Sequence, residues 1–465
     1  MQPMSKSMWK RLLAVLALIS LVAAACGNDD DPDTSSPAAG TEAPAANEQQ
    51  AEGPSGAETE PEPADEAPDS GEPDAEESDM ADTEAPAPET TSDLFGEPNP
   101  ATGEPLKVGF VSDGRSDAID NSAEIPAAQA AAAYANDYLG GVAGRPIEFI
   151  TCETGQTPAG AQDCVAELAQ AGVVAILNGV SGQGEVLSAQ ANEAGIPYVA
   201  NGGLSQAIFN APMSFVIGNG LGALVGPAAV ASEKGLTKVG IIVIDVPAAV
   251  EPVSQAAPLF YGNVGVEADI IAVAPGTPDM TPQVQAAIIN DAQQFAIIGD
   301  ETFCISAMQA IQTLGFEGET IVVRTCIGEA TVDQVDVDGI RVVTGTSDDM
   351  SDPEVALYHA VMDEYGGTLD TIAEGGYSAV LSWVRAMAGH GDGEVTPESV
   401  VETMLAMEPA PLPIGAQGST FQCNRMAVAI APAICSPGFA IYTLDENGRG
   451  TGTSFLDLTR VLTLG

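Results

Sequence analysis

The stretch Leu106-Lys107-Val108-Gly109-Phe110-Val111-Ser112 decides the fold, because apolar residues run almost unbroken over residues 106–111. Such a run is typical of a parallel strand that is buried on both faces of a sheet. Nine similar runs follow at residues 146–150, 173–177, 197–200, 215–218, 239–245, 270–274, 295–299, 320–323 and 340–343. Each is too apolar for a surface strand, so we expect a protein built around buried parallel strands.

Helical segments with recognisable ends lie between these runs. Thr157 precedes Pro158, a favourable first-turn residue, and Gly172 closes the same segment. An alanine-rich helix is expected from residue 124 to the glycines at 140–141, and another opens at Pro282. Helical patterns at 353–365, 371–388 and 397–407 precede a last strand at 439–444. Alternating strands and helices predict a doubly wound α/β fold, and the roughly 360 residues involved favour two lobes.

The first 26 residues form a candidate export signal. Lys6, Lys10 and Arg11 precede an apolar stretch at 12–25, which is short for a membrane span. Three alanines then lead directly into Cys26 and Gly27, which resembles a bacterial lipoprotein signal. The resemblance implies lipidation of Cys26 and an extracytoplasmic, membrane-anchored protein. The alternative is an ordinary cleaved signal with an incidental cysteine.

Residues 27–104 differ in composition from everything that follows. They contain 24 Asp and Glu residues and no Lys or Arg, together with many Pro, Ala, Ser and Thr residues. Such a segment cannot bury a core, so we expect a disordered tether. The rest of the chain has 42 acidic against 11 basic residues, a net charge of −31. Nucleic acid and anionic membrane surfaces are therefore poor partners.

The cysteines support an oxidising compartment. Without Cys26 six remain, in three local pairs: Cys152 with Cys164, Cys304 with Cys326, and Cys423 with Cys435. Six cysteines allow 15 connectivities, of which we expect this local one. Zinc is the rival interpretation, but the sequence has no CxxC and only two histidines, His359 and His390. We expect neither a metal nor a cofactor.

Several segments together resemble the branched-chain amino-acid type of ABC-transporter substrate-binding protein. The opening strand is one of them, and the others are ITC at 150–152, ILNGVSG at 176–182, GIPYVANGG at 195–203 and GGYSAV at 375–380. The resemblance covers most of residues 106–449 and implies the type I periplasmic-binding fold. In that fold two parallel-sheet lobes are joined by a three-strand hinge and close on a ligand. Crossovers are then expected near Asn219, near Thr346 and within 423–437, with lobe 1 at 105–218 and 347–436 and lobe 2 at 219–346 and 437–465.

The same resemblance implies where a ligand would bind. Ser181 and Gly182 match one carboxylate-binding position of the family, and Gly202 and Gly203 match a second. Other contacts expected for an amino acid are missing, because the corresponding positions are Leu204, Ala249 and Thr325. Thr325 is kept as a candidate contact, and a ligand with donor or cationic groups would find acceptors in Asp113, Asp245 and Asp300.

Three single motifs allow another interpretation. Residues 218–223 (GNGLGA) with Asp245 resemble a dinucleotide site, although the glycines also suit a tight crossing between lobes. Ser181 lacks the second glycine of a nucleophile elbow and has no evident histidine partner. Asp245 and Asp300 equally suit helix capping.

We therefore expect a monomeric solute-binding protein that is not an enzyme and that delivers a small polar molecule to an ABC-type permease. A sensory receptor with the same fold is the main alternative, and an extracytoplasmic enzyme is the other.

Overall fold

The structure, a computed structural model, describes residues 94–116, 120–203, 205–391 and 393–463. Cys26, the signal-like segment and residues 27–93 of the expected tether lie outside the described residues, as does Leu204. Within the described part of the chain, none of the helices combines the length and apolar character that a membrane crossing needs.

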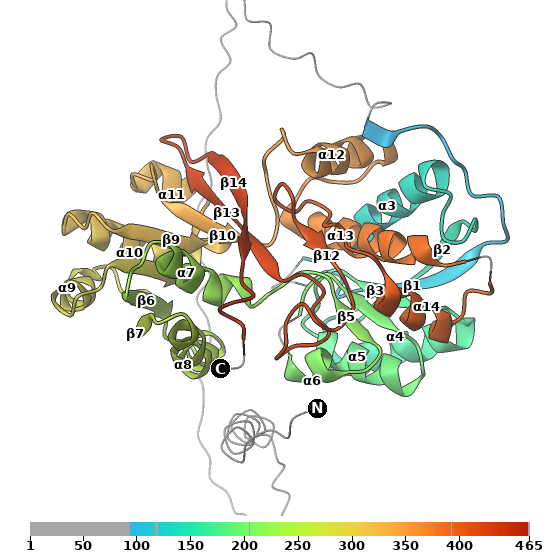
Figure 1. The fold of residues 1–465 in the computed structure, drawn as a ribbon, viewed down its shortest axis with the longest axis horizontal. Helices are drawn as coiled ribbons and strands as arrows, with labels where there is room; N and C mark the ends of the chain where they lie inside the picture. Colours follow the sequence, from blue (N-terminus) through green and yellow to red (C-terminus); the bar gives the residue numbers. More distant parts are fainter. Residues whose placement is uncertain (1–93, 117–119, 204, 392, 464–465) are drawn as a thin grey trace, which may run out of the picture. The chain divides into compact units, whose positions relative to one another are not determined.

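The first lobe is built on a five-stranded sheet with the order β2-β1-β3-β4-β5 (Figure 1). All four pairings are parallel, with Val108 opposite Phe149 and Gly109 opposite Ile176. The strands are β1 (Leu106–Ser112), β2 (Ile147–Glu153), β3 (Ile176–Asn178), β4 (Tyr198–Ala200) and β5 (Ser214–Val216). Their apolar sequences agree with their position, since every residue of β3, β4 and β5 is buried.

Helices cover both faces of this sheet. On one face α3 (Glu124–Tyr138) and α13 (Thr371–Ala386) pack against each other, and on the other α4 (Pro158–Ala171) packs against α5 (Gly184–Glu193). Phe110 belongs to the core under the first helix pair and Val111 to the core under the second, as the period of two along a strand requires. The remaining elements of this lobe are α6 (Gln206–Asn210), α12 (Pro353–Tyr365), η3 (Met387–Gly389), α14 (Pro397–Ala406), β11 (Ala410–Pro411) and β12 (Thr420–Phe421).

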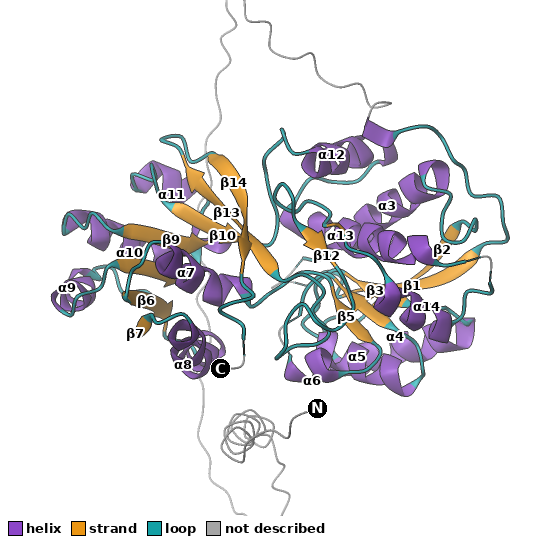
Figure 2. Cartoon of the chain, viewed as in Figure 1, coloured by secondary structure: helices purple, strands orange, loops and turns teal. Residues whose placement is uncertain are grey.

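The second lobe is built on a seven-stranded sheet with the order β14-β13-β10-β9-β8-β6-β7 (Figure 2). Five strands are parallel: β6 (Lys238–Ile244), β7 (Glu267–Val273), β8 (Gln294–Ile298), β9 (Glu319–Val323) and β10 (Arg341–Thr344). Two antiparallel strands, β13 (Gly438–Leu444) and β14 (Gly450–Asp457), extend the sheet beyond β10. The helices are α7 (Gly222–Glu233), α8 (Pro247–Asn263), α9 (Thr281–Ile289), α10 (Glu301–Thr313), η2 (Arg324–Cys326) and α11 (Glu329–Gln334).

The chain passes between the two sheets three times. It leaves the first sheet after β5, returns after β10 to form α12–α14, and enters the second sheet again at β13. The first and third crossings run side by side, because Val216 N–H donates to Ala433 O (2.8 Å) and Cys435 N–H donates to Val216 O (2.8 Å). The α/β fold with two parallel-sheet lobes and a three-strand connection is thus confirmed, while the exact lobe boundaries stay a prediction.

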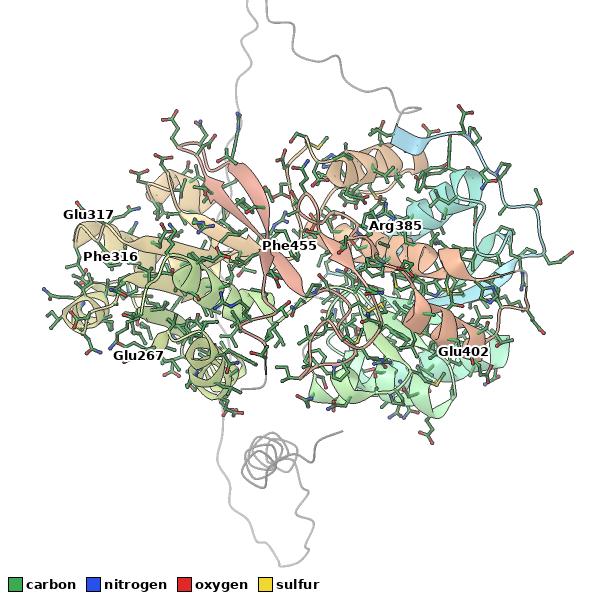
Figure 3. All side chains as sticks on the ribbon, viewed as in Figure 1. Glu267, Phe316, Glu317, Arg385, Glu402 and Phe455 are labelled. Carbon is green, nitrogen blue, oxygen red and sulfur yellow. A yellow bond between two sulfur atoms is a disulfide. The ribbon has the colours of Figure 1, made fainter. Side chains whose placement is uncertain are left out.

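Most of the expected elements are present, with three differences at sheet edges. Strands β2 and β7 are edge strands and are only partly buried, contrary to the expectation that every apolar run lies inside. Strand β14 was not expected, because its sequence GTGTSFLD lacks an apolar run. The strand is mostly exposed and forms by pairing with β13. Figure 3 labels Phe455 of β14, whose ring lies so close to Gly438 of β13 that a Cβ there would meet it at 2.1 Å.

The folded part begins earlier than the expected end of the tether at residue 104. Phe95 is 5% exposed and its ring contacts Tyr134, Tyr138 and Tyr365 at centroid distances of 5.0–6.4 Å. Asn99 N–H also donates to Asp137 O. The tether boundary is therefore corrected for residues 94–104: one aromatic side chain provides the apolar surface that the surrounding composition lacks.

The three expected disulfides are present. They join Cys152 to Cys164, Cys304 to Cys326 and Cys423 to Cys435, with Cα–Cα distances of 5.6, 5.3 and 4.4 Å. Each closes a loop of at most 22 residues, so each constrains one small part of the fold. The first joins strand β2 to α4, the second joins α10 to η2, and the third joins the two ends of the third crossing segment.

Candidate functional site

The carboxyl ends of strands β1 and β3 form the point where the first sheet reverses its winding. From β1 the chain runs through α3 to β2 on one side, and from β3 it runs through α5 to β4 on the other. In open α/β sheets ligands bind in the crevice outside such a point. Asp113 follows β1 and Ser181 lies three residues after β3, so the topology brings these two predicted site residues together.

The carboxylate of Asp113 accepts three hydrogen bonds there. The hydroxyls of Thr154 and Ser181 each donate to Oδ1 at 2.7 Å, and the N–H of Gly182 donates to Oδ2 at 2.7 Å. Asp113 is only 4% exposed. Three of the predicted residues, Asp113, Ser181 and Gly182, therefore form one cluster, and Thr154 is a fourth member that the sequence did not identify.

A second buried carboxyl, Glu124, lies beside this cluster and was also missed. Its Oε1 accepts the N–H of Val180 at 2.6 Å, whereas no hydrogen bond to its buried Oε2 is found among the described residues. Burial raises the pKa of Glu124 to about 7, against the lowering effect of the Val180 hydrogen bond. Glycine is required opposite it, since a Cβ on Gly179 would lie 2.3 Å from Oε1.

The two predicted glycines after β4 contribute backbone to the same edge. Gly202 N–H donates to Gly179 O at 3.1 Å, which ties the loop after β4 to the loop after β3. A Cβ on Gly203 would meet Ile208 at 3.4 Å, and both glycines are half-buried. The donor of Gly202 is thus already used within the chain.

The second sheet reverses its winding between β6 and β8. Asp245 follows β6 and Asp300 lies two residues after β8, and both are exposed. Asp300 caps α10 by accepting Phe303 N–H at 3.0 Å, as the capping interpretation expected. Thr325 lies close to Asp300, because its hydroxyl donates to Gly299 O at 2.8 Å.

A cavity of about 480 Å³ lies at this edge of the second sheet. Its lining mixes acidic, hydroxyl and apolar groups, among them Ile244, Thr277, Asp300, Glu301 and Phe303. Neither Lys nor Arg is among the described residues that line it. Among the residues that the structure describes, no group of three or more His, Cys, Asp or Glu side chains could hold a metal ion.

Arg324 is a further charged residue near this edge, and the sequence did not identify it. It follows β9, and its guanidinium contacts Thr346 (2.9 Å), Asp348 (3.1 Å) and Glu374 (3.5 Å). Burial raises the pKa of Glu374, while Arg324 and a hydrogen bond from Thr346 (2.8 Å) act in the opposite direction. Since Glu374 belongs to α13, this network joins the carboxyl end of the second sheet to a helix of the first lobe. A basic residue directly after an apolar run was the signal that could have identified it.

The glycines at 218–223 have a packing role in the structure. A Cβ on Gly222 would lie 2.2 Å from the ring of Phe439, and one on Gly218 would lie 3.0 Å from Asn201 O. Close approach to β13 and to the loop after β4 therefore accounts for both residues without a nucleotide.

Comparisons with known proteins agree with this architecture. A sequence model of the family described as "Periplasmic binding protein" matches residues 105–431. No curated protein matches the chain significantly. Similar solved structures share the fold at low identity. A putative branched-chain amino acid ABC transporter from Rhodospirillum rubrum has a TM-score of 0.62 and 19% identity, covering 77% of this chain and 100% of that chain.

Two further structures carry ligands. The branched-chain amino acid transporter substrate-binding protein from Streptococcus pneumoniae, in complex with isoleucine, has a TM-score of 0.53 and 17% identity over 76% of this chain and 100% of that one. The solute-binding protein of an ABC transporter from R. palustris, in complex with benzoate, has a TM-score of 0.54 and 16% identity over 76% and 97%.

Proposed function

Because this chain belongs to the periplasmic binding protein family, we propose that it is an extracytoplasmic receptor that closes on a small polar solute and delivers it to an ABC-type permease. The family consists of substrate-binding proteins, and catalysis is not part of the proposed function. The observation that carries the proposal is the coincidence of polar side chains with both winding reversals: Asp113 and Ser181 in the first lobe, Asp245 and Asp300 in the second.

Closure of the two lobes is the mechanism we propose. The three crossings are the segments around which two rigid lobes would move, with lobe 1 at 105–218 and 347–436 and lobe 2 at 219–346 and 437–465. The ion pair of Arg324 with Glu374 at 3.5 Å supports this mechanism, because it links a residue that follows a strand of the second sheet to a helix of the first lobe. Ligand contacts are proposed from both lobes: Ser181, Gly182, Gly202, Gly203 and Asp113 in the first, and Asp245, Asp300 and Thr325 in the second.

The ligand is proposed to carry hydrogen-bond donors or positive charge. The similar proteins with ligands bind isoleucine and benzoate, each of which carries a carboxylate. In this chain the sheet edges at both winding reversals carry acceptors, and Arg324 is already paired with two carboxylates. An isolated anion would therefore find little compensation here, while an amide, urea or amine would find acceptors on both sides.

The test is a thermal-shift screen of the full chain, as exported by cells, against amino acids, amides, urea, polyamines and small carboxylates. We expect one class of donor-bearing solute to raise Tm in a saturable manner. The matched control is Asp245→Asn, which keeps the size of the side chain and should reduce the shift if Asp245 faces the ligand. If no solute class shifts Tm and titration calorimetry shows no binding, the receptor function is wrong.

Membrane attachment through Cys26 is proposed from the sequence alone. Metabolic labelling with a fatty acid should mark the wild type, and Cys26→Ser should abolish the label. Export of an unlabelled wild-type protein would instead support the ordinary cleaved signal.

A further inference from the structure

The donors at the first-lobe edge are already used by the protein itself. Ser181 has one hydroxyl proton, which it donates to Asp113, while its oxygen accepts the N–H of Gln183 at 2.9 Å. Gly182 has one N–H, which it also donates to Asp113. Thr154 completes the set from the end of β2, and its oxygen accepts the N–H of Gln156 at 3.0 Å. The three groups form a donor cradle, defined here as Thr154 Oγ1, Ser181 Oγ and Gly182 N.

This cradle has the composition of a carboxylate-binding site. Two hydroxyls and a backbone N–H would hold both oxygens of an incoming carboxylate, and two of these three donors, Ser181 Oγ and Gly182 N, lie just before helix α5. In this chain both oxygens come from Asp113, which reaches the cradle from the neighbouring strand β1 and is 96% buried. No ion pair of the described residues includes Asp113.

We propose that Asp113 is a specificity-determining residue: a built-in carboxylate that closes the donor cradle to carboxylate ligands. This proposal rests on the proposed receptor function and narrows its ligand. The group of the solute that faces the first lobe is then a neutral or cationic hydrogen-bond donor, because a second carboxylate would meet an occupied cradle and a like charge. Among the described residues Gly182 alone donates to Oδ2, so this oxygen keeps an acceptor position for such a donor.

The test is chemical rescue of Asp113→Ala by acetate. Removing the side chain leaves three donors around a space the size of a carboxylate, so acetate should bind there and raise Tm in a saturable manner. We expect an affinity for acetate at least tenfold higher than that of the wild type, measured by titration calorimetry. Chloride at equal ionic strength serves as the control for general salt effects.

Two matched variants locate the effect. Asp113→Asn keeps the volume of the side chain and should gain no acetate binding, because the cradle stays filled. Ser181→Ala in the Asp113→Ala background removes one donor and should weaken the acetate affinity at least threefold. An Asp113→Ala protein that is folded and indifferent to acetate would overturn the proposal.

A measurement on the wild type keeps the proposal testable if Asp113→Ala does not fold. Wild-type protein should show no saturable binding of acetate or benzoate by ligand-observed NMR. Millimolar binding of either anion that Ser181→Ala weakens would show that ligands displace Asp113, and would overturn the proposal. The receptor function and the role of Asp113 can fail independently. If acetate rescues Asp113→Ala but no solute in the screen binds, the receptor function alone is refuted. If a solute binds but acetate does not rescue, the role of Asp113 alone is refuted.

Discussion

Replacing Glu124 by Gln should increase the stability of the protein, relative to that of the wild type, as pH rises from 4.5 to 8. The carboxyl is fully buried, and its pKa is raised from the usual 4.5 to about 7 by desolvation. A group whose pKa is higher in the folded state gives its full stabilisation below the unfolded pKa, and this is lost as pH rises through the folded pKa. Glu124 should therefore become increasingly unfavourable between pH 4.5 and pH 7.

The size of the effect follows from the two pKa values. Each tenfold change in a proton equilibrium is worth about 1.4 kcal/mol, so ionising Glu124 in the folded state costs ~3 kcal/mol by pH 8. Gln keeps an oxygen for the N–H of Val180 and cannot ionise. The amide group of Gln would replace the buried Oε2, and burying it carries a free-energy cost that is the same at every pH. This cost offsets part of the gain in stability at high pH.

The assay is urea unfolding of the wild type and Glu124→Gln at pH 4.5 and pH 8. The free energy of unfolding of the variant, relative to the wild type, should rise by ~3 kcal/mol between the two pH values. Glu398→Gln is the matched control, because Glu398 also lies in the first turn of a helix but is exposed, and its difference should change by less than ~1 kcal/mol. Parallel pH curves for Glu124→Gln and the wild type would refute the reasoning.

Three further predictions concern stability. Reducing the three disulfides should lower Tm in calorimetry, since each short loop is worth about 3 kcal/mol, and mass spectrometry that finds six free thiols before reduction would contradict the pairing. Gly222→Ala should destabilise by about 1–3 kcal/mol in chemical denaturation, because the new Cβ meets Phe439. Gly262→Ala, with nothing within 4 Å of the new Cβ, should be neutral or stabilising by up to ~1 kcal/mol, and equal effects of the two would argue against the close approach. Phe95→Ala should cost about 3 kcal/mol by the same measurement, whereas no loss would place residues 94–104 with the tether.

The order of the elements and the disulfide pairs could be read from the sequence because both are local properties. Apolar runs of strand length, capping residues such as Thr157 and Asp300, and short spacings between cysteines each carry their signal within a few residues. The sequence failed to predict strand β14 and the packing of Phe95, because neither depends on a local pattern. Strand β14 is held by its neighbour and not by its own apolar content, and Phe95 packs on tyrosines that are distant in sequence.

The candidate site was decided by the tertiary structure. The sequence singled out Asp113 independently of the pair Ser181 and Gly182, but Asp113 lies 41 residues from Thr154 and 68 from Ser181. Their meeting depends on the strand order β2-β1-β3, which places the ends of three strands side by side. Strand order is set by how helices pack on both faces of a sheet, and no local pattern encodes it. The sequence therefore determined which groups this protein could offer to a ligand, and the fold determined that one of them, a carboxylate, is held by the others.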